Sequence, residues 1–384
     1  MAASKTKSEY HWVMLSLSFA IASLLHLLLF ATAPMVTVIM EEMGLSHADF
    51  GLVFSAAMMS LIVFRIPWGL VGDRIGYLNV LRIALPISAA SAVLRAFSAS
   101  YLPLLLSQFF LGLGIAAVMP CLPLLVKEWS SGQSLGLSTG IYVSGFAVGN
   151  AIALGLTPLL LEMMGWRDVL LAYSGLATVL CGLWWCLARS DVKSTSEFQL
   201  ENFARVLKDR YVWVLLCFMI ASMGSYDTLA TWMPKVLEMK EVNKTLASLL
   251  PLGFFLAGPI VGFASDRFHN RKAIVATLGA VAATAILGIN YAPFPILLLC
   301  IFLSGFTIIG VLTISLAAPA EHERLSASVG GVIGLISSLG NIGPLVMPVV
   351  FGFLIDVTGT FQASVVSIAV LTGVTFVVGS RVSE

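Results

Sequence analysis

Long apolar stretches dominate the chain and alternate with short polar breaks. Twelve of these stretches approach the roughly 20 residues that a helix needs to cross the hydrocarbon core of a membrane. They are continuously apolar, unlike the alternating strands of about ten residues in a membrane β-barrel. The pattern predicts twelve spanning helices, at approximately Trp12–Pro34, Ala48–Val71, Leu78–Phe97, Leu102–Val126, Leu135–Leu161, Val169–Leu187, Val212–Pro234, Leu246–Ala264, Ala273–Tyr291, Pro295–Ala318, Ala327–Ile355 and Phe361–Gly379.

The composition supports helices in a membrane and excludes several other classes of protein. The 384-residue chain is 59% hydrophobic and 11% charged, with a mean hydropathy of +0.98, whereas about 25% of the residues in a soluble domain are charged. A soluble enzyme, a nucleic-acid-binding protein and a disordered chain are therefore excluded. The five cysteines are odd in number and lie within or beside apolar runs, which argues against disulfides and metal ligation. We expect an all-α integral membrane protein without a metal or a cofactor.

Basic residues determine the predicted orientation of the helices. If the N-terminus is cytoplasmic, fifteen of the 21 lysines and arginines fall on the cytoplasmic side, as the positive-inside rule requires. Arg65 lies inside a span, and five basic residues fall on the opposite side: Arg95, Arg167, Lys235, Lys240 and Lys244. The sequence thus predicts a multi-pass protein of the cell membrane with both termini in the cytoplasm.

The two halves of the chain repeat the same landmarks in the same order. The corresponding landmarks, at offsets of 193, 191 and 194 residues, are Gly72-Asp73-Arg74 and Ser265-Asp266-Arg267, Gly149-Asn150 and Gly340-Asn341, and Gly165 and Gly359. We therefore predict an N-terminal six-helix half at residues 1–188, a cytoplasmic linker at 189–211 and a C-terminal six-helix half at 212–384. Repeated halves around a site near the middle of the membrane are typical of secondary transporters.

The repeated turns resemble a motif of a known family. The segment Gly69-Leu-Val-Gly72-Asp73-Arg74-Ile-Gly76 is similar to the G-x-x-x-D-R-x-G loop between helices two and three of the major facilitator superfamily. The segment Gly262-Phe-Ala-Ser265-Asp266-Arg267 resembles its second copy, between helices eight and nine. The resemblance implies the major facilitator fold and transport by alternating access. In this chain Tyr77-Leu78-Asn79 replaces the basic pair that usually follows the first copy, which implies a weaker cytoplasmic contact in the first half.

The repeated charges form a candidate cytoplasmic latch. A carboxylate at Asp73 or Asp266 can cap the N-terminus of a neighbouring helix. Arg74 and Arg267 can form contacts across the two halves only when the cytoplasmic side is closed, which would make the contact bistable. The alternative is a pair of solvated turns, and we favour the latch because the motif recurs in both halves.

Arg65 is the strongest candidate for a substrate ligand. An ionised side chain at the membrane centre costs about 2.5–3.5 kcal/mol on insertion scales, and guanidinium offers a planar fork of donors to an anion. The segment Phe64-Arg65-Ile66-Pro67 resembles helix two of the nitrate/nitrite porters, a resemblance that implies an anion ligand at Arg65. The alternatives are an arginine that reaches the cytoplasm and one paired with a carboxylate.

The resemblance to nitrate porters is incomplete. Those porters carry a second arginine on helix eight, where this chain has Gly258. The segment from Tyr226 to Pro234 is more similar to cyanate-type and organic-anion porters. These features favour a small monovalent anion, of which nitrate is one example.

Other polar and small residues in the spans are candidates for the substrate path. Asn150 and Asn341 can donate hydrogen bonds into a cavity between the halves, or can simply join neighbouring helices. His26 and Tyr142 are further candidate cavity residues, although a packed histidine or aromatic residue explains them equally simply. Gly145 and Gly149 are four residues apart, which predicts a close approach of two helices.

Asp227 is a second acidic candidate inside the membrane. It lies toward the outer end of the seventh predicted span. The carboxylate could form a gate by pairing with Arg95 or Lys235, or could carry a coupled proton. We favour the gate.

The sequence predicts a secondary transporter for a small anion, of the nitrate, nitrite, cyanate or small carboxylate type. A phosphate-binding loop for ATP hydrolysis and a nucleophile motif are both absent from the sequence, so we do not expect an enzyme. We expect a monomer whose partners are the anion, membrane lipid and a coupled proton or counter-anion, and no nucleic acid. The alternative is proton-coupled efflux of drugs or hydrophobic metabolites, a class that often has an arginine where this chain has Gln108.

Overall fold

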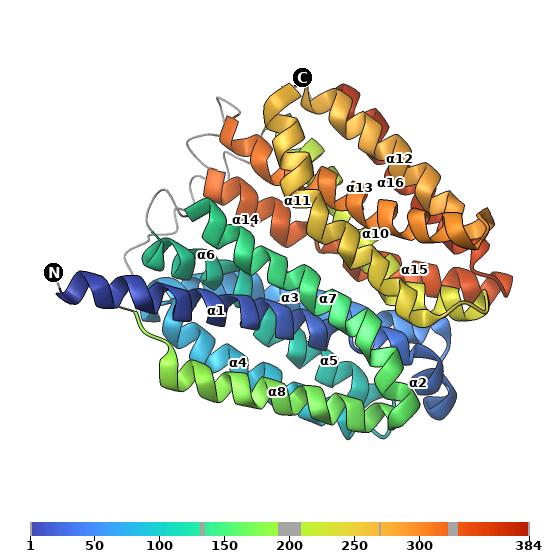
Figure 1. Cartoon of the computed structure of the whole chain (residues 1–384). Helices are drawn as coiled ribbons and strands as arrows, with labels where there is room; N and C mark the ends of the chain where they lie inside the picture. Colours follow the sequence, from blue (N-terminus) through green and yellow to red (C-terminus); the bar gives the residue numbers. More distant parts are fainter. Residues whose placement is uncertain (1, 131–134, 191–208, 269, 322–328, 383–384) are drawn as a thin grey trace.

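The computed structural model describes residues 2–130, 135–190, 209–268, 270–321 and 329–382 (Figure 1). Every element in these ranges is a helix. The first half of the chain contains α1 (Ala2–Phe30), η1 (Ala33–Met35), α2 (Val36–Met43), α3 (His47–Ile75), α4 (Tyr77–Ala96), α5 (Tyr101–Ile115), α6 (Val118–Trp129), α7 (Leu135–Met163) and α8 (Trp166–Leu187). The second half contains α10 (Arg210–Met239), η2 (Lys244–Ser248), α11 (Leu249–Phe268), α12 (Arg271–Tyr291), α13 (Phe294–Glu321), α14 (Val329–Leu339), α15 (Ile342–Thr358) and α16 (Gln362–Val382).

Helices at equivalent positions of the two halves pack against one another in the same way. In the first half α1 packs on α7, α3 on α5 and α4 on α8. In the second half α10 packs on α15, α11 on α13 and α12 on α16. The halves meet where α3 packs on α15 and α7 packs on α11, which are again equivalent pairs. The landmarks repeated in the sequence thus accompany a repeated packing arrangement.

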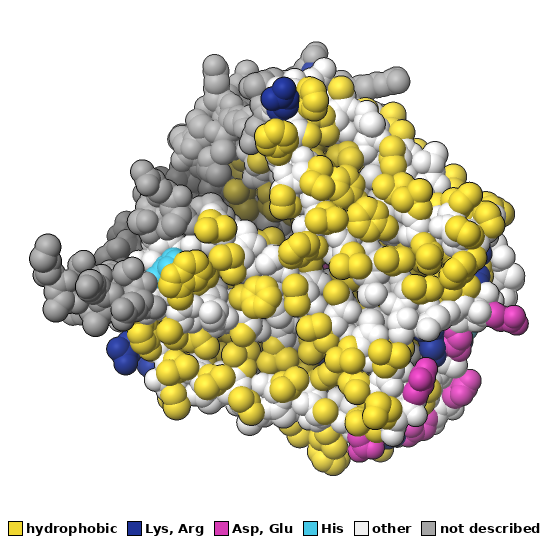
Figure 2. All heavy atoms as spheres, viewed as in Figure 1, with side chains coloured by type: hydrophobic (Ala, Val, Ile, Leu, Met, Phe, Trp, Pro, Cys, Tyr) yellow, Lys and Arg dark blue, Asp and Glu magenta, His cyan; other side chains and the backbone are white. Residues whose placement is uncertain are grey.

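The helices are long and apolar enough to cross a membrane, as the sequence predicts. Eleven described segments meet that criterion, and Gln362–Val377 forms a shorter apolar helix. Many large apolar side chains point outward, including Leu137, Met163, Phe263 and Tyr291. Figure 2 shows hydrophobic side chains spread over the middle of the visible face, with acidic groups gathered at its right-hand end. This distribution is that of a bundle whose outer surface contacts lipid.

Three of the predicted spans differ in detail from a continuous helix. The first continues beyond Pro34 through α2 and ends at Met43. The fourth is interrupted between α5 and α6, and the eleventh between α14 and α15. Hydropathy does not reveal these breaks, because the residues within and beside them are as apolar as those of the helices. Residues 327 and 328, at the predicted start of the eleventh span, and 191–208 of the predicted linker lie outside the described residues.

The two halves share a hydrophobic core at only one end of the bundle. We call the end where α8 finishes and α10 begins the linker end, and the opposite end, which carries α2, the closed end. One core contains buried residues of the whole first half together with Tyr226, Trp232 and Phe351 of the second half. A separate core at the linker end contains only second-half residues, such as Val212 and Val332. The halves are therefore packed together at the closed end and have separate interiors at the linker end.

The closed end depends on close approach of α3 and α15. A Cβ atom added at Gly51 of α3 would lie 2.6 Å from the Pro348 carbonyl oxygen, and one at Gly352 of α15 would lie 2.3 Å from the His47 carbonyl oxygen. These distances are too short for any larger residue unless the helices separate. The two glycines therefore allow backbone contact between the halves.

Gly145 provides a test of packing inside the first half, because the predicted close approach of α7 and α1 is confirmed. A Cβ atom at Gly145 would lie 2.7 Å from the Phe19 carbonyl oxygen, whereas nothing lies within 4 Å of one at Gly140 on the same helix. We expect Gly145→Ala to cost about 1–3 kcal/mol, the usual penalty of overpacking. Thermal unfolding of the purified protein measures this as a lower Tm. Gly140→Ala is the matched control and should leave the Tm unchanged or raise it slightly.

Candidate functional site

Arg65 lies deep in α3 and reaches the second half. It is ten residues from the end of α3 at Ile75, about 15 Å at 1.5 Å per residue. Its residue exposure is 8%, and its Nη1 donates a hydrogen bond of 2.6 Å to the Ser337 carbonyl oxygen of α14. No carboxylate among the described residues forms an ion pair with Arg65. The paired and surface-reaching alternatives therefore do not describe this conformation.

Asn341 converges on the same carbonyl group as Arg65. It lies at the break between α14 and α15, and its Nδ2 donates to the carbonyl oxygens of Ser337 at 2.8 Å and Ser338 at 3.2 Å. These oxygens belong to the C-terminal end of α14, which carries a partial negative charge. That end partly balances the guanidinium of Arg65. An anion that replaced the Ser337 carbonyl would find both a cation and an amide donor there.

A second polar group joins the halves through Asn150. The Oδ1 atom of Asn150 lies 3.3 Å from Nδ1 of His26 on α1, and its Nδ2 donates to the Tyr226 hydroxyl of α10 at 3.2 Å. Asn150 and Tyr226 are buried. Of the two roles considered for Asn150, this conformation has the interhelical hydrogen bond. Among the described residues, no hydrogen bond connects this group to Arg65 or Asn341.

Aromatic rings surround the second group. The His26 ring lies 4.4 Å, centroid to centroid, from the Phe146 ring, which in turn lies 6.2 Å from the ring of Tyr142. On the other side the Tyr226 ring contacts Phe254 at 5.3 Å. The structure thus places His26, Tyr142 and Asn150 together, in an apolar surrounding that excludes most water.

Asp227 forms neither of the pairings considered for it. Arg95 donates elsewhere, and Lys235 contacts Thr37 and Glu238. Within the described residues, the Asp227 carboxylate has no hydrogen-bond or ion-pair partner. It lies beside Tyr226 and is half-buried, so it remains a candidate for coupling and not for the gate of this conformation.

The assignment of Arg95 to the outer loops is wrong. Arg95 is fully buried, and its Nη1 donates to the Leu28 carbonyl oxygen at 2.7 Å and to Oε1 of Gln108 at 3.0 Å. Leu28 belongs to the last turn of α1, so Arg95 caps the point where the first span breaks. The sequence shows a basic residue at the end of a span, but it does not show that another helix end covers it.

The latch residues are apart in this conformation. Arg74 and Arg267 are both exposed, as expected where the interiors of the halves are separate. Asp73 is half-buried at the end of α3, and the side chain of Asp266 lies outside the described residues. The role of these four residues remains a prediction.

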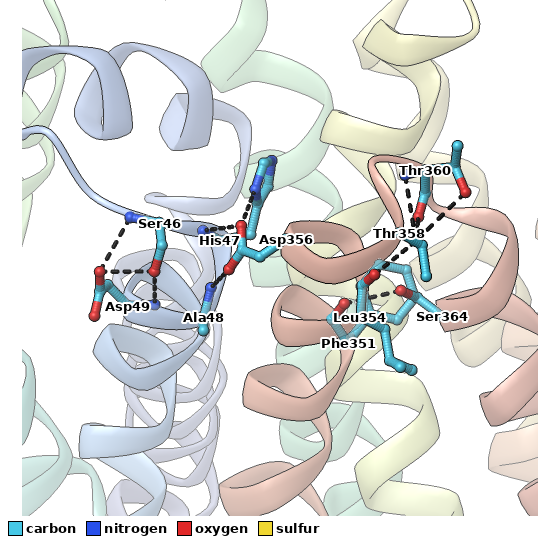
Figure 3. A network of polar contacts seen from close by, with 10 residues as sticks. All are labelled: Ser46, His47, Ala48, Asp49, Phe351, Leu354, Asp356, Thr358, Thr360 and Ser364. Carbon is cyan, nitrogen blue, oxygen red and sulfur yellow. Dashed lines mark hydrogen bonds and ion pairs between the residues drawn. The ribbon is translucent and has the colours of Figure 1, made fainter.

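The closed end carries polar contacts that the sequence analysis missed. The Asp356 carboxylate near the end of α15 accepts from the backbone N–H groups of His47 and Ala48, at the start of α3 (Figure 3). Nearby, the Thr37 hydroxyl donates to Glu238 of α10 at 2.9 Å. Both carboxylates lie at the ends of apolar stretches, where charged residues are common. Their partners are about 200 or 300 residues away in sequence, so no local pattern reveals them.

The contact between Asn150 and Tyr226 can be measured as a coupling energy. We expect Tyr226→Phe to remove about 1 kcal/mol of stability, because it leaves the buried Asn150 donor without an acceptor. A double-mutant cycle with Asn150→Ala, followed by thermal unfolding, should give strongly non-additive effects. The control is Tyr173→Phe, whose hydroxyl pairs with Thr157 inside the first half. Its effect should add to that of Asn150→Ala, and equal coupling in both cycles would contradict the assignment.

Known proteins similar to this chain are transporters. It is 25% identical over 374 residues to a probable sulfoacetate transporter of Cupriavidus necator, covering 88% of this chain and 85% of the relative. It is 25% identical over 381 residues to a probable nitrate/nitrite antiporter of Thermus thermophilus, covering 88% and 84%. A D-galactonate transporter of Escherichia coli is 26% identical over 363 residues, covering 82% of each.

A solved structure shares the fold. The structure of a bacterial homologue of the human lysosomal transporter Spinster, in an inward-facing and unoccupied conformation, superposes with a TM-score of 0.79. The match covers 97% of both chains at 17% sequence identity. The sequence model of the Major Facilitator Superfamily matches residues 18–251 and 240–382. With this match, the repeated helix packing and the long apolar helices, the chain belongs to the Major Facilitator Superfamily and is a transporter, not an enzyme.

Proposed function

We propose that this transporter moves a small anion by alternating access, with Arg65 as the anion ligand. The observation that carries the proposal is the buried guanidinium between the halves, which has a backbone carbonyl and no carboxylate as its partner. A buried cation without a carboxylate partner is costly in a membrane and marks a substrate site by default. Its planar donors suit a carboxylate, a sulfonate or nitrate.

The relatives support an anionic substrate. The printed names of three similar proteins specify sulfoacetate, nitrate or nitrite, and D-galactonate, all of which are anions. With one arginine and a monovalent anion, the loaded site would be nearly neutral. Neutrality would lower the electrostatic cost of moving the anion through the low-dielectric bundle.

The present conformation corresponds to the cytoplasm-facing step of this cycle. The halves share a core at the closed end and have separate cores at the linker end. By the distribution of basic residues, the linker end and both termini face the cytoplasm. An anion arriving there would replace the Ser337 carbonyl at Arg65 and accept a hydrogen bond from Asn341.

Reorientation would then exchange the open and closed ends. The cytoplasmic latch of Asp73, Arg74, Asp266 and Arg267 would form as the linker end closes, and the contacts at the opposite end would separate. Asp227, next to the Asn150 group, is the candidate carrier of a coupled proton. The fold needs no second subunit for these steps, so we propose a monomer.

Ligand-dependent stability tests the anion site. Purified protein would be heated with nitrate, nitrite, cyanate, small carboxylates or hydrophobic cations. An anion at ten times its Kd should stabilise the protein by about 1.4 kcal/mol, from RT ln(1 + [L]/Kd). We expect Arg65→Gln to abolish the rise in Tm with the anion that stabilises the unmodified protein.

Arg95→Gln is the matched control, because Arg95 is also a buried arginine without a carboxylate partner among the described residues. This variant is expected to lower the starting Tm but to keep the rise caused by the anion. Stabilisation by hydrophobic cations, or an anion response that persists in Arg65→Gln, would contradict the proposal. The first of these results would favour efflux of hydrophobic compounds instead.

A further inference from the structure

We infer that Asp356 is the gate residue of the closed end, holding the two halves together by capping a helix of the opposite half. The inference rests on the alternating-access part of the proposed function and not on the identity of the substrate. It assigns a role in the transport cycle to a residue outside the candidate anion site.

All printed contacts of the Asp356 carboxylate cross from the second half to the first. Its Oδ1 accepts from the backbone N–H of His47 at 3.0 Å and lies 2.7 Å from the imidazole Nδ1 of the same residue. Its Oδ2 accepts from the backbone N–H of Ala48 at 2.9 Å. Figure 3 shows the carboxylate of α15 directed at the first turn of α3. Three donors of one half thus converge on one side chain of the other.

The start of α3 needs Asp356 for two of its backbone donors. The Ser46 side chain caps the N–H of Asp49, and the Asp49 carboxylate accepts the N–H of Ser46. That capping box leaves the N–H groups of His47 and Ala48, which are the two that Asp356 accepts. Since a helix N-terminus carries partial positive charge, a carboxylate is the favoured partner. The first half supplies one part of the cap and the second half the other.

The second acidic contact at this end is weaker as a link between the halves. Glu238 accepts one hydroxyl of the first half, from Thr37, and its other contacts are Lys235 and Lys244 of its own half. Trp232 of the second half adds ring contacts to His47 and Phe50, each at 5.8 Å between centroids. These aromatic contacts are non-directional by comparison, which leaves Asp356 as the principal polar link.

The Asp356 contact is suited to repeated opening and closing. The His47 and Asp356 side chains are 23% and 27% exposed, so water can replace the lost partners when the end opens. A fully buried pair would leave uncompensated charge after separation. The contact can therefore favour the closed state without making opening prohibitively slow.

The accessibility of Ser55 provides the measurement. Ser55 is fully buried and lies one helical turn from Gly51, on the side of α3 that faces α15. In protein lacking its five native cysteines, Ser55→Cys would be alkylated by a membrane-impermeant maleimide only when the closed end opens. The alkylation rate then follows the open population, however small.

Asp356→Asn should raise the alkylation rate about tenfold, which corresponds to about 1.4 kcal/mol. His47→Gln removes the imidazole contact and keeps both backbone contacts, so a smaller increase is expected. Asp49→Asn is the matched control, because it removes the same charge from the same helix start without crossing the halves. It should change the rate less than twofold. Ser174→Cys, buried inside the first half, should remain unreactive in every variant and so reports unfolding.

Gly51→Leu separates failure of the gate from failure of alternating access. The added side chain cannot fit against Pro348, so it should force the closed end open and raise the Ser55→Cys rate. If Gly51→Leu raises the rate and Asp356→Asn does not, the role of Asp356 is wrong and the opening of this end stands. If Asp49→Asn raises it as much as Asp356→Asn, the cap across the halves is also wrong. If neither Gly51→Leu nor Asp356→Asn raises it, this end does not open, and the alternating-access proposal fails too.

Discussion

The need to pair polar groups where water is scarce governs the arrangement of this protein. Inside the hydrocarbon layer an unpaired N–H, carbonyl or charge costs several kcal/mol. Helices satisfy most of the backbone, and the exceptions occur at their ends and breaks. Arg95 covers the end of α1, Asn341 covers the end of α14, and Asp356 covers the start of α3. The polar side chains that matter are those that complete an unfinished helix end.

The contacts differ in whether they stay within one half. The cap at Arg95 lies inside the first half and can remain intact while the halves move as rigid bodies. The contacts of Arg65 with Ser337 and of Asp356 with α3 cross between the halves. In the proposed cycle these crossing contacts must break and reform, which is why partly exposed groups suit the closed end better than fully buried ones.

The sequence predicts the global architecture well because that architecture depends on hydropathy. Twelve apolar stretches and a repeated turn motif were sufficient for an all-α transporter of this superfamily, and Arg65 stood out as a charge inside a span. Ser337 could not be identified, because it contributes a backbone carbonyl that carries no signature of its residue type. Arg95 was misplaced and Asp356 overlooked for a related reason. Their partners belong to helices distant in sequence, and only the packing of the bundle brings them together.

The shared carbonyl of Ser337 has a consequence for how tightly the proposed substrate can bind. While the site is empty, Arg65 already has an internal acceptor at 2.6 Å, so an incoming anion must compete with it. The apparent affinity is reduced by the fraction of time that the arginine is engaged. The same competitor helps to expel the anion once it has been carried across. Such self-competition favours fast release over tight retention, and it suits a carrier that works on an abundant solute rather than one that scavenges a trace compound.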